Sequence, residues 1–139
     1  MSFATNSSHL VVHHDRYLGI DPGLNRTGYA VIERRASGPY LIEGGILLST
    51  QSATLQHRVQ ELAHGLQEVI EELRPEVAAI EEVFSHVQNP KTAILMAHAR
   101  GGILLTLANA KITTVNYAPT QIKRLLTGSG QAYKEQIQH

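Results

Sequence analysis

Two acidic side chains stand where apolar strands are expected to end, and their type and position suit them to chemistry. Asp21 closes the segment 17–21, and Glu81 lies near the end of the segment 76–84. Both segments have the composition of strands. A carboxylate in apolar surroundings is costly unless a positive charge balances it. A bound cation would supply that charge at either position.

Asp21 also has a simpler interpretation. Pro22 and Gly23 follow it and predict a type II turn, because Pro presets φ at the second position and Gly accepts a positive φ at the third. Asp is common at the first position of turns, so Asp21 could serve the turn alone. The presence of a second acid at Glu81 favours the cation site over this alternative.

The first third of the chain predicts an antiparallel meander of three strands. After the strand that ends at Asp21, residues 29–33 alternate in polarity and indicate a second strand. Residues 34–39 then predict a hairpin loop, and residues 40–48 a third strand. Gly44-Gly45 suggests a bulge or a kink in that third strand.

An amphipathic helix is predicted next. It begins at a cap provided by Ser52 or Thr54 and runs to about Arg74, where Pro75 ends it. A helix between two strands is the crossover of a parallel pair, so the strand 76–84 is expected beside the first strand. The apolar residues of this helix recur at steps of three and four: Leu55, Val59, Leu62, Leu66, Val69, Ile70 and Leu73.

This topology brings Asp21 and Glu81 to one edge of the sheet. The carboxyl ends of strands are where open α/β sheets place their sites. Two carboxylates in one apolar corner repel each other unless a divalent cation lies between them, and ligands that are all oxygen favour Mg²⁺ or Mn²⁺. Glu82 is expected to point the other way and to be exposed.

The second half of the chain predicts a helix over residues 92–110 that is apolar around nearly its whole circumference. Such a helix must be buried on every side, and in a domain of this size a partner subunit is the natural cover. Residues 111–117 predict a fifth strand, Pro119 opens a short helix, and another helix begins at Gln131.

Length and composition fit one globular domain. The chain has 139 residues, 42% of them hydrophobic, and no cysteine, which excludes disulfides and thiolate catalysis. No apolar run approaches the length of a membrane span. Residues 1–16 are expected to be a flexible N-terminal tail without a secretory signal, which favours a cytoplasmic location. The histidines of this tail are interpreted as incidental: His9, His13 and His14.

Charge is unevenly distributed, although the formal total is zero. Residues 1–84 contain six Lys/Arg and eleven Asp/Glu, a balance of −5, whereas residues 85–139 contain six Lys/Arg and one Asp/Glu, a balance of +5. An acidic cleft beside a basic surface would have this pattern. Uneven surface charge without a function is the alternative.

The predicted order βββ-α-β-α-β-α is the ribonuclease H-like arrangement, an α/β fold with a five-stranded mixed sheet and helices on both faces. The chain closely resembles the RuvC family of Holliday junction resolvases, the crossover junction endodeoxyribonucleases. The resemblance extends over roughly residues 17–139. It is carried by the segments 18–29, 79–84, 97–101 and 117–139.

The resemblance implies roles for five residues. Asp21 and Glu81 match two of four catalytic acids, which in this family hydrolyse a phosphodiester with the help of two metal ions. Phe84 matches an aromatic residue that stacks on bases at the junction centre, although a core residue that caps the strand is the alternative. Lys123 and Lys134 match basic residues near the strand that is cut, where they would position phosphate.

The chain departs from the family pattern at the remaining two acids. The family has an Asp-x-x-Asp pair on a helix further along, whereas Glu135 is the one acid in residues 85–139 and is not a replacement. We therefore expect the domain 17–139 to lack its C-terminal helix. Two carboxylates can hold one hydrated Mg²⁺ weakly, so cleavage by this chain is expected to be impaired.

Three functions are therefore compared. A metal-dependent junction endonuclease is the first, and a module that binds branched DNA without cutting it is the second. A ribonuclease H-like ATP-binding phosphotransfer domain is a distant third, because that class carries a second domain that this sequence does not show. The resemblance further implies four-way junction DNA and a homodimer as partners, together with a branch-migration motor, and no membrane.

Overall fold

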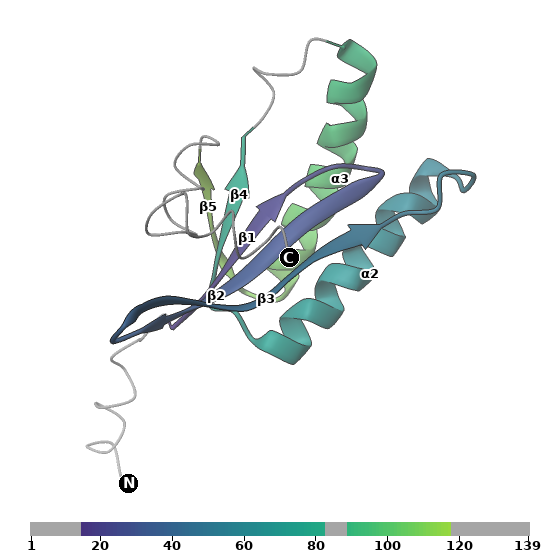
Figure 1. Ribbon diagram of the computed structural model, residues 1–139. Helices are drawn as coiled ribbons and strands as arrows, with labels where there is room; N and C mark the ends of the chain where they lie inside the picture. The colour runs from purple at the N-terminus through teal and green to yellow at the C-terminus, as the bar shows by residue number, and fades with distance from the viewer. Residues whose placement is uncertain (1–14, 83–88, 118–139) are drawn as a thin grey trace, which may run out of the picture.

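The computed structural model describes residues 15–82 and 89–117. Within them, the helices and strands follow the order expected from the sequence (Figure 1). The predicted tail and the helices expected after residue 118 lie largely or wholly outside these residues. The elements are β1 (Arg16–Asp21), β2 (Arg26–Arg35), β3 (Gly38–Leu48), α2 (Leu55–Leu73), β4 (Val77–Glu81), α3 (Pro90–Asn109) and β5 (Thr113–Tyr117).

The five strands form one mixed sheet in the order β3-β2-β1-β4-β5. β1, β2 and β3 are the predicted antiparallel meander. β4 lies parallel to β1 and to β5, because the connections through α2 and α3 return the chain to the starting end of the sheet. This confirms the predicted position of β4 beside β1.

The hairpin between β2 and β3 is tighter than the predicted loop over residues 34–39. Strand pairing continues to Arg34 opposite Pro39 and Arg35 opposite Gly38, so only two residues form the turn. Gly38 makes this possible because its φ is 116°, a value that a residue with a side chain rarely adopts.

The predicted bulge at Gly44-Gly45 is wrong in its position. Val31 pairs with Glu43 and Ile32 pairs with Leu41, which leaves Ile42 as the extra residue of β3. Gly45 has another role. A Cβ atom there would lie 2.6 Å from the hydroxyl oxygen of Tyr29, so the glycine makes room for that ring.

Helix α2 begins where the sequence predicted. Thr54 is the N-cap, and its side chain accepts a hydrogen bond from the backbone N–H of His57 at 3.2 Å. The helix ends at Leu73, and Arg74 follows in the left-handed conformation with φ 52°. Four of the seven residues of the predicted apolar stripe are buried: Leu62, Leu66, Val69 and Leu73.

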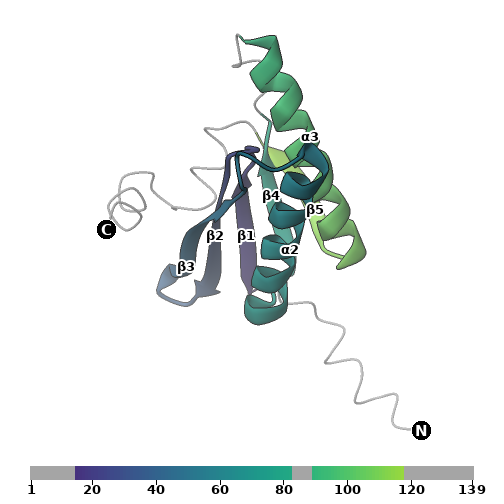
Figure 2. The ribbon, with the colours of Figure 1, turned by 90° about the vertical axis from the view of Figure 1, so that its right-hand side faces the viewer.

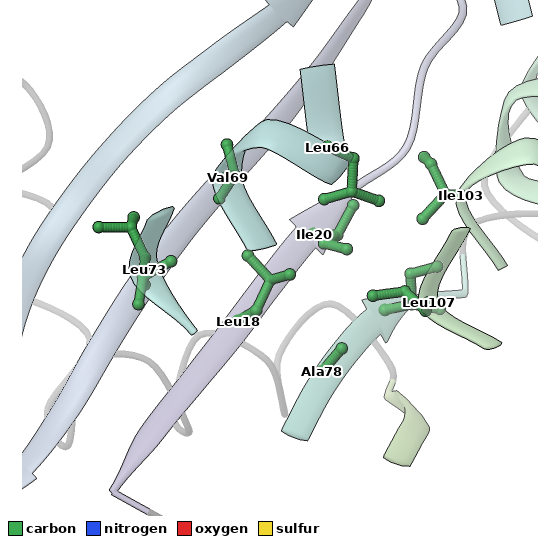
Figure 3. Packing of buried hydrophobic residues seen from close by; sticks show 10 residues of the cluster. Leu18, Ile20, Leu66, Val69, Leu73, Ala78, Ile103 and Leu107 are labelled. Carbon is green, nitrogen blue, oxygen red and sulfur yellow. The ribbon is translucent and has the colours of Figure 1, made fainter. Parts of the chain in front are cut away.

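The core lies between one face of the sheet and the two helices (Figure 3). β1 and β4 contribute alternate residues to this core. Ala30 and Ile32 of β2 are buried on the other face, where they pack with Leu41. α2 and α3 both lie on this side of the sheet (Figure 2), so helices on the second face stay a prediction for residues outside the described ranges. The buried cluster comprises Leu18, Ile20, Val31, Leu66, Val69, Leu73, Ala78, Ile80, Ile103 and Leu107.

Helix α3 is only partly buried within this chain. Asn89 caps it, accepting a hydrogen bond from the N–H of Lys91 at 3.0 Å, and Ala99, Ile103 and Leu107 face the core. The opposite side is exposed, although it is also apolar. The sequence predicted that a partner subunit would bury this side of the helix.

Among the described residues, no helix is long and apolar enough to cross a membrane.

Candidate active site

Asp21 and Glu81 end two neighbouring parallel strands. The last paired residues of β1 and β4 are Ile20 and Ile80, and each acid is the next residue along its strand. Neighbouring strands of a sheet lie about 4.8 Å apart. The predicted juxtaposition of the two acids at one edge of the sheet is therefore what the strand register produces.

Both acids lie on the face of the sheet opposite to α2 and α3. Ile20 and Ile80 belong to the buried cluster under the helices, and side chains alternate between the two faces of a strand. Asp21 is exposed and Glu81 is half-buried. Glu82 is exposed, as predicted. Within the described residues, the two acids therefore lie together on the face of the sheet that α2 and α3 do not cover.

The turn that follows Asp21 is not the predicted type II turn. Gly23 does not have a positive φ, and four residues separate β1 from β2. The hydroxyl of Thr27 holds this loop: it donates to the Gly23 carbonyl at 2.8 Å and accepts from the Gly23 N–H at 3.2 Å. A Cβ at Gly23 would lie 2.4 Å from the Arg26 carbonyl oxygen, so close backbone approach requires the glycine.

Buried residues hold this loop against the helices. Thr27 is fully buried, and Leu24 is 4% exposed. Leu24 forms a small apolar cluster with Leu62 of α2 and Ala99 of α3. The loop that follows the first acid is thus fixed by the same helices that cover the core.

The residues present fit part of a site for a hard divalent cation. Carboxylate oxygens are the ligands that Mg²⁺ and Mn²⁺ prefer, and Asp21 and Glu81 supply them from rigid strands. Within residues 15–82 and 89–117, no group of three or more His, Cys, Asp or Glu side chains could hold a metal ion. Among the described residues, Asp21 and Glu81 therefore offer two carboxylates of the chemistry that such a site requires.

Tyr29 is a titratable group on the other face of the sheet, where it packs against the core, so it is not a base for the two acids. It pairs with Ile20 across β1 and β2, and its hydroxyl donates a hydrogen bond to Glu43 Oε2 at 2.7 Å. Burial, followed by this hydrogen bond, raises the pKa of Tyr29 to about 12. The phenol therefore stays protonated at neutral pH.

Three of the predicted site residues are not placed. Phe84, Lys123 and Lys134 lie outside the described residues.

The structure also reveals contacts that the sequence analysis missed, because polar pairs distant in the sequence leave no periodic signal. Arg58 contacts the loop after Asp21, and Arg100 of α3 donates to the side-chain oxygen of Asn116 on β5. One feature of the sequence could have indicated the contact of Arg58: this basic residue lies at the border of the apolar stripe, three residues after Leu55.

A mixed sheet in this strand order, with a helix crossover between β1 and β4 and an acid at the end of each, defines a ribonuclease H-like domain. Residues 17–139 match the family described as Crossover junction endodeoxyribonuclease RuvC. The chain belongs to this RuvC family.

Individual relatives agree with this assignment. The RuvC protein of Rhodopirellula baltica is 49% identical over 121 residues, which cover 87% of this chain and 68% of the relative. That of Bordetella avium is 41% identical over 123 residues, which cover 88% of this chain and 67% of the relative.

Solved structures agree in fold. The Thermus thermophilus RuvC structure is 30% identical with a TM-score of 0.71, covering 88% of this chain and 75% of that one. The same protein in complex with a Holliday junction substrate is 25% identical with a TM-score of 0.71, covering 78% and 69% of the two chains.

Proposed function

We propose that this protein is a structure-selective endonuclease that resolves four-way DNA junctions in recombination and repair. The observation that carries the proposal is the pairing of Asp21 and Glu81 at adjacent strand ends in a chain of the RuvC family. Outward-facing acids on a rigid sheet suit a large substrate, because a duplex cannot enter a closed cavity. In a bacterium such DNA lies in the cytoplasm, which is where we place the activity.

In this proposal Asp21 and Glu81 are catalytic residues that hold Mg²⁺ or Mn²⁺. When bound, such ions activate water and stabilise the leaving oxygen in phosphodiester hydrolysis. The protein contributes the fixed position of the two carboxylates, which costs no reorganisation because both belong to paired strands. We further propose that Phe84 stacks on bases, and that Lys123 and Lys134 contact phosphates.

The second candidate is a module that binds junctions but cuts them poorly. It is favoured by the observation that the described residues offer two carboxylates and no larger ligand cluster. The chain spans about two thirds of the length of its curated relatives, 68% and 67% in the two cases above. In this candidate the protein recognises the junction, and two carboxylates alone hold a hydrated Mg²⁺ only weakly, so cleavage is slow.

We also propose a homodimer formed through α3. Its exposed side carries Ile94, which is 58% exposed, and Leu105, which is 63% exposed. Gly101 lies between them, and a Cβ atom there would meet nothing within 4 Å, so packing within the described chain does not require a glycine at this position. A small residue on an apolar stripe suits close approach of a second helix. A dimer would give two active sites related by a two-fold axis, which matches the symmetry of a four-way junction.

The test measures binding and cleavage of a labelled four-way junction, with a duplex of the same sequence as the competitor and with Mg²⁺ or Mn²⁺ present. The variants are Asp21→Asn and Glu81→Gln, with Glu82→Gln as the control because this neighbouring acid is exposed. We expect a preference for the junction in all four proteins. Any metal-dependent nicking should disappear in the first two variants and persist in the control.

The outcomes separate the candidates. Nicking at the rate of the full-length Rhodopirellula baltica relative would exclude the poorly cutting module. Equal affinity for junction and duplex would contradict both candidates. An association with a branch-migration motor is proposed from the family resemblance alone, and would be examined by copurification after junction binding is established.

A further inference from the structure

Arg58 of α2 joins three separate segments at the edge of the sheet that carries the acids. Its Nε atom donates to Ser49 Oγ at 3.1 Å, and its terminal nitrogen donates to Asn25 Oδ1. Ser49 follows β3, and Asn25 lies in the loop between β1 and β2. One guanidinium therefore connects the second turn of a helix, the end of an edge strand and the loop that follows Asp21.

Ser49 extends this connection to the backbone of the same loop. Its hydroxyl donates to the Leu24 carbonyl at 2.5 Å, and its backbone N–H donates to the Asn25 carbonyl at 3.2 Å. The loop is thus held through two backbone carbonyls and one side chain. A planar guanidinium suits this task because its donors have a fixed geometry.

The start of α2 is itself firmly attached. Thr50 donates to the two carboxylate oxygens of Glu61, from its N–H at 3.1 Å and from its hydroxyl at 2.9 Å. The same hydrogen bonds, first the backbone one and then the hydroxyl one, lower the pKa of Glu61, which keeps this acceptor ionised. Arg58 therefore acts from a fixed support.

We propose that Arg58 is a positioning residue for the site. Through Ser49 and Asn25 it fixes the loop 22–25, and thereby the direction of the Asp21 carboxylate at the end of β1. It does so without contacting the metal or the reacting phosphate. The inference rests on the proposed role of Asp21 as a metal ligand, and it assigns to α2 a part in the site beyond its packing in the core.

The test compares Arg58→Lys with the wild type and with Arg74→Lys. The first variant keeps the charge and loses the fork of donors, and the control makes the same change at the other end of α2. Amide hydrogen exchange of Ser49 and Gly23 reports the loop directly, without metal. Mg²⁺ is then titrated while the amide signals of β1 and β2 are followed, and junction binding is measured at several salt concentrations.

We expect Arg58→Lys to raise the exchange rate of these amides about tenfold and to weaken Mg²⁺ binding about tenfold, as is typical for groups that orient metal ligands. Junction affinity and its dependence on salt should not change. The control should match the wild type in every measurement.

Four results would overturn the inference. Unchanged exchange at Ser49 and Gly23 would show that Arg58 does not hold the loop. A loosened loop with wild-type Mg²⁺ affinity would show that the loop does not position Asp21. A salt dependence of junction binding reduced by about one phosphate contact, with Mg²⁺ affinity unchanged, would make Arg58 a phosphate ligand instead. If the wild type and Asp21→Asn respond identically to Mg²⁺, the proposed function of Asp21 fails, and the inference fails with it.

Discussion

Gly44 and Gly45 are neighbours on β3, yet their surroundings differ. A Cβ at Gly45 would lie 2.6 Å from the hydroxyl oxygen and 2.8 Å from the Cζ atom of Tyr29, whereas a Cβ at Gly44 would meet its nearest atom at 3.9 Å. We predict that Gly45→Ala displaces the ring and breaks the hydrogen bond from Tyr29 to Glu43. Its free energy of unfolding should fall by about 1–3 kcal/mol.

Gly44→Ala is the matched control, because it makes the same change one residue earlier on the other face. Its free energy of unfolding should be close to that of the wild type. Chemical denaturation of both variants measures the difference. Equal losses in the two variants would mean that the backbone, and not the Tyr29 ring, requires the glycine.

Glu33 makes stability depend on pH. Its carboxylate accepts hydrogen bonds from Arg35 Nε at 2.8 Å and Arg16 Nε at 2.9 Å, and these bonds, that of Arg35 first, lower its pKa from the usual 4.5. Because the pKa is lower in the folded state, this acid stabilises the fold above its unfolded pKa, and the contribution disappears as pH falls through the folded value. We predict that stability decreases below about pH 4.5, and that the decrease is smaller in Glu33→Gln.

The measurement is thermal unfolding between neutral and acid pH. Arg35→Gln removes only one of the two partners, so its pH dependence should lie between those of the wild type and Glu33→Gln. Identical pH profiles in all three proteins would exclude Glu33 as a source of the effect.

Among the individual residues, the positions of Asp21 and Glu81 were predicted from the sequence, because these positions follow from strand order and register. It did not predict Arg58, Ser49 or Asn25. Those contacts depend on which loop lies against which helix end, and neither composition nor periodicity encodes that arrangement. The role of Gly23 was misassigned for a similar reason: Pro-Gly in a sequence suggests a positive φ, whereas the structure uses the missing side chain for close approach to the Arg26 carbonyl.

Helix α2 is followed by a left-handed residue that is not glycine. Arg74 adopts φ 52° and ψ 53°, and its N–H donates to the Ile70 carbonyl. Glycine is the usual residue at such a position because it avoids the steric cost of a Cβ atom. We predict that Arg74→Gly raises the free energy of unfolding by about 0.5–1 kcal/mol.

Arg74→Ala separates the backbone from the side chain. It removes the charge but keeps the Cβ atom, so it should not stabilise the protein. Denaturation curves for both variants measure the difference. Equal stabilisation by Gly and Ala would assign the effect to the Arg side chain.

Whole elements were predicted better than their connections. The meander, the crossover helix and the parallel β4 follow from periodicity and from the rule for parallel strands, and all three are present. The hairpin turn at 36–37 is shorter than predicted, and the bulge lies at Ile42 and not at the predicted Gly44-Gly45. Both features depend on how far two strands pair with each other, which the sequence of one strand alone does not determine.

The exposed apolar side of α3 affects the oligomeric state of the whole molecule. Contact of such a stripe with water is unfavourable, and packing against a second copy of the chain would remove it from solvent. We predict that Leu105→Glu converts a dimer to a monomer, because it places a charge on the exposed apolar side of α3. Sedimentation over a range of protein concentrations measures the mass.

Tyr40→Glu is the control, since Tyr40 is 50% exposed and lies on β3, away from α3. It should leave the mass unchanged. A wild-type protein that remains monomeric at all concentrations would refute the dimer through α3.

The parallel pairing of β1 with β4 has a consequence for how the protein acquires its activity. Asp21 and Glu81 are 60 residues apart in the chain, and only the completed crossover through α2 brings them together. A nascent chain that has not yet emerged as far as β4 would therefore have no site to load. If Asp21 and Glu81 bind a divalent cation as proposed, the cation can bind only after this long-range closure, and its binding free energy would favour the finished domain over partly folded forms.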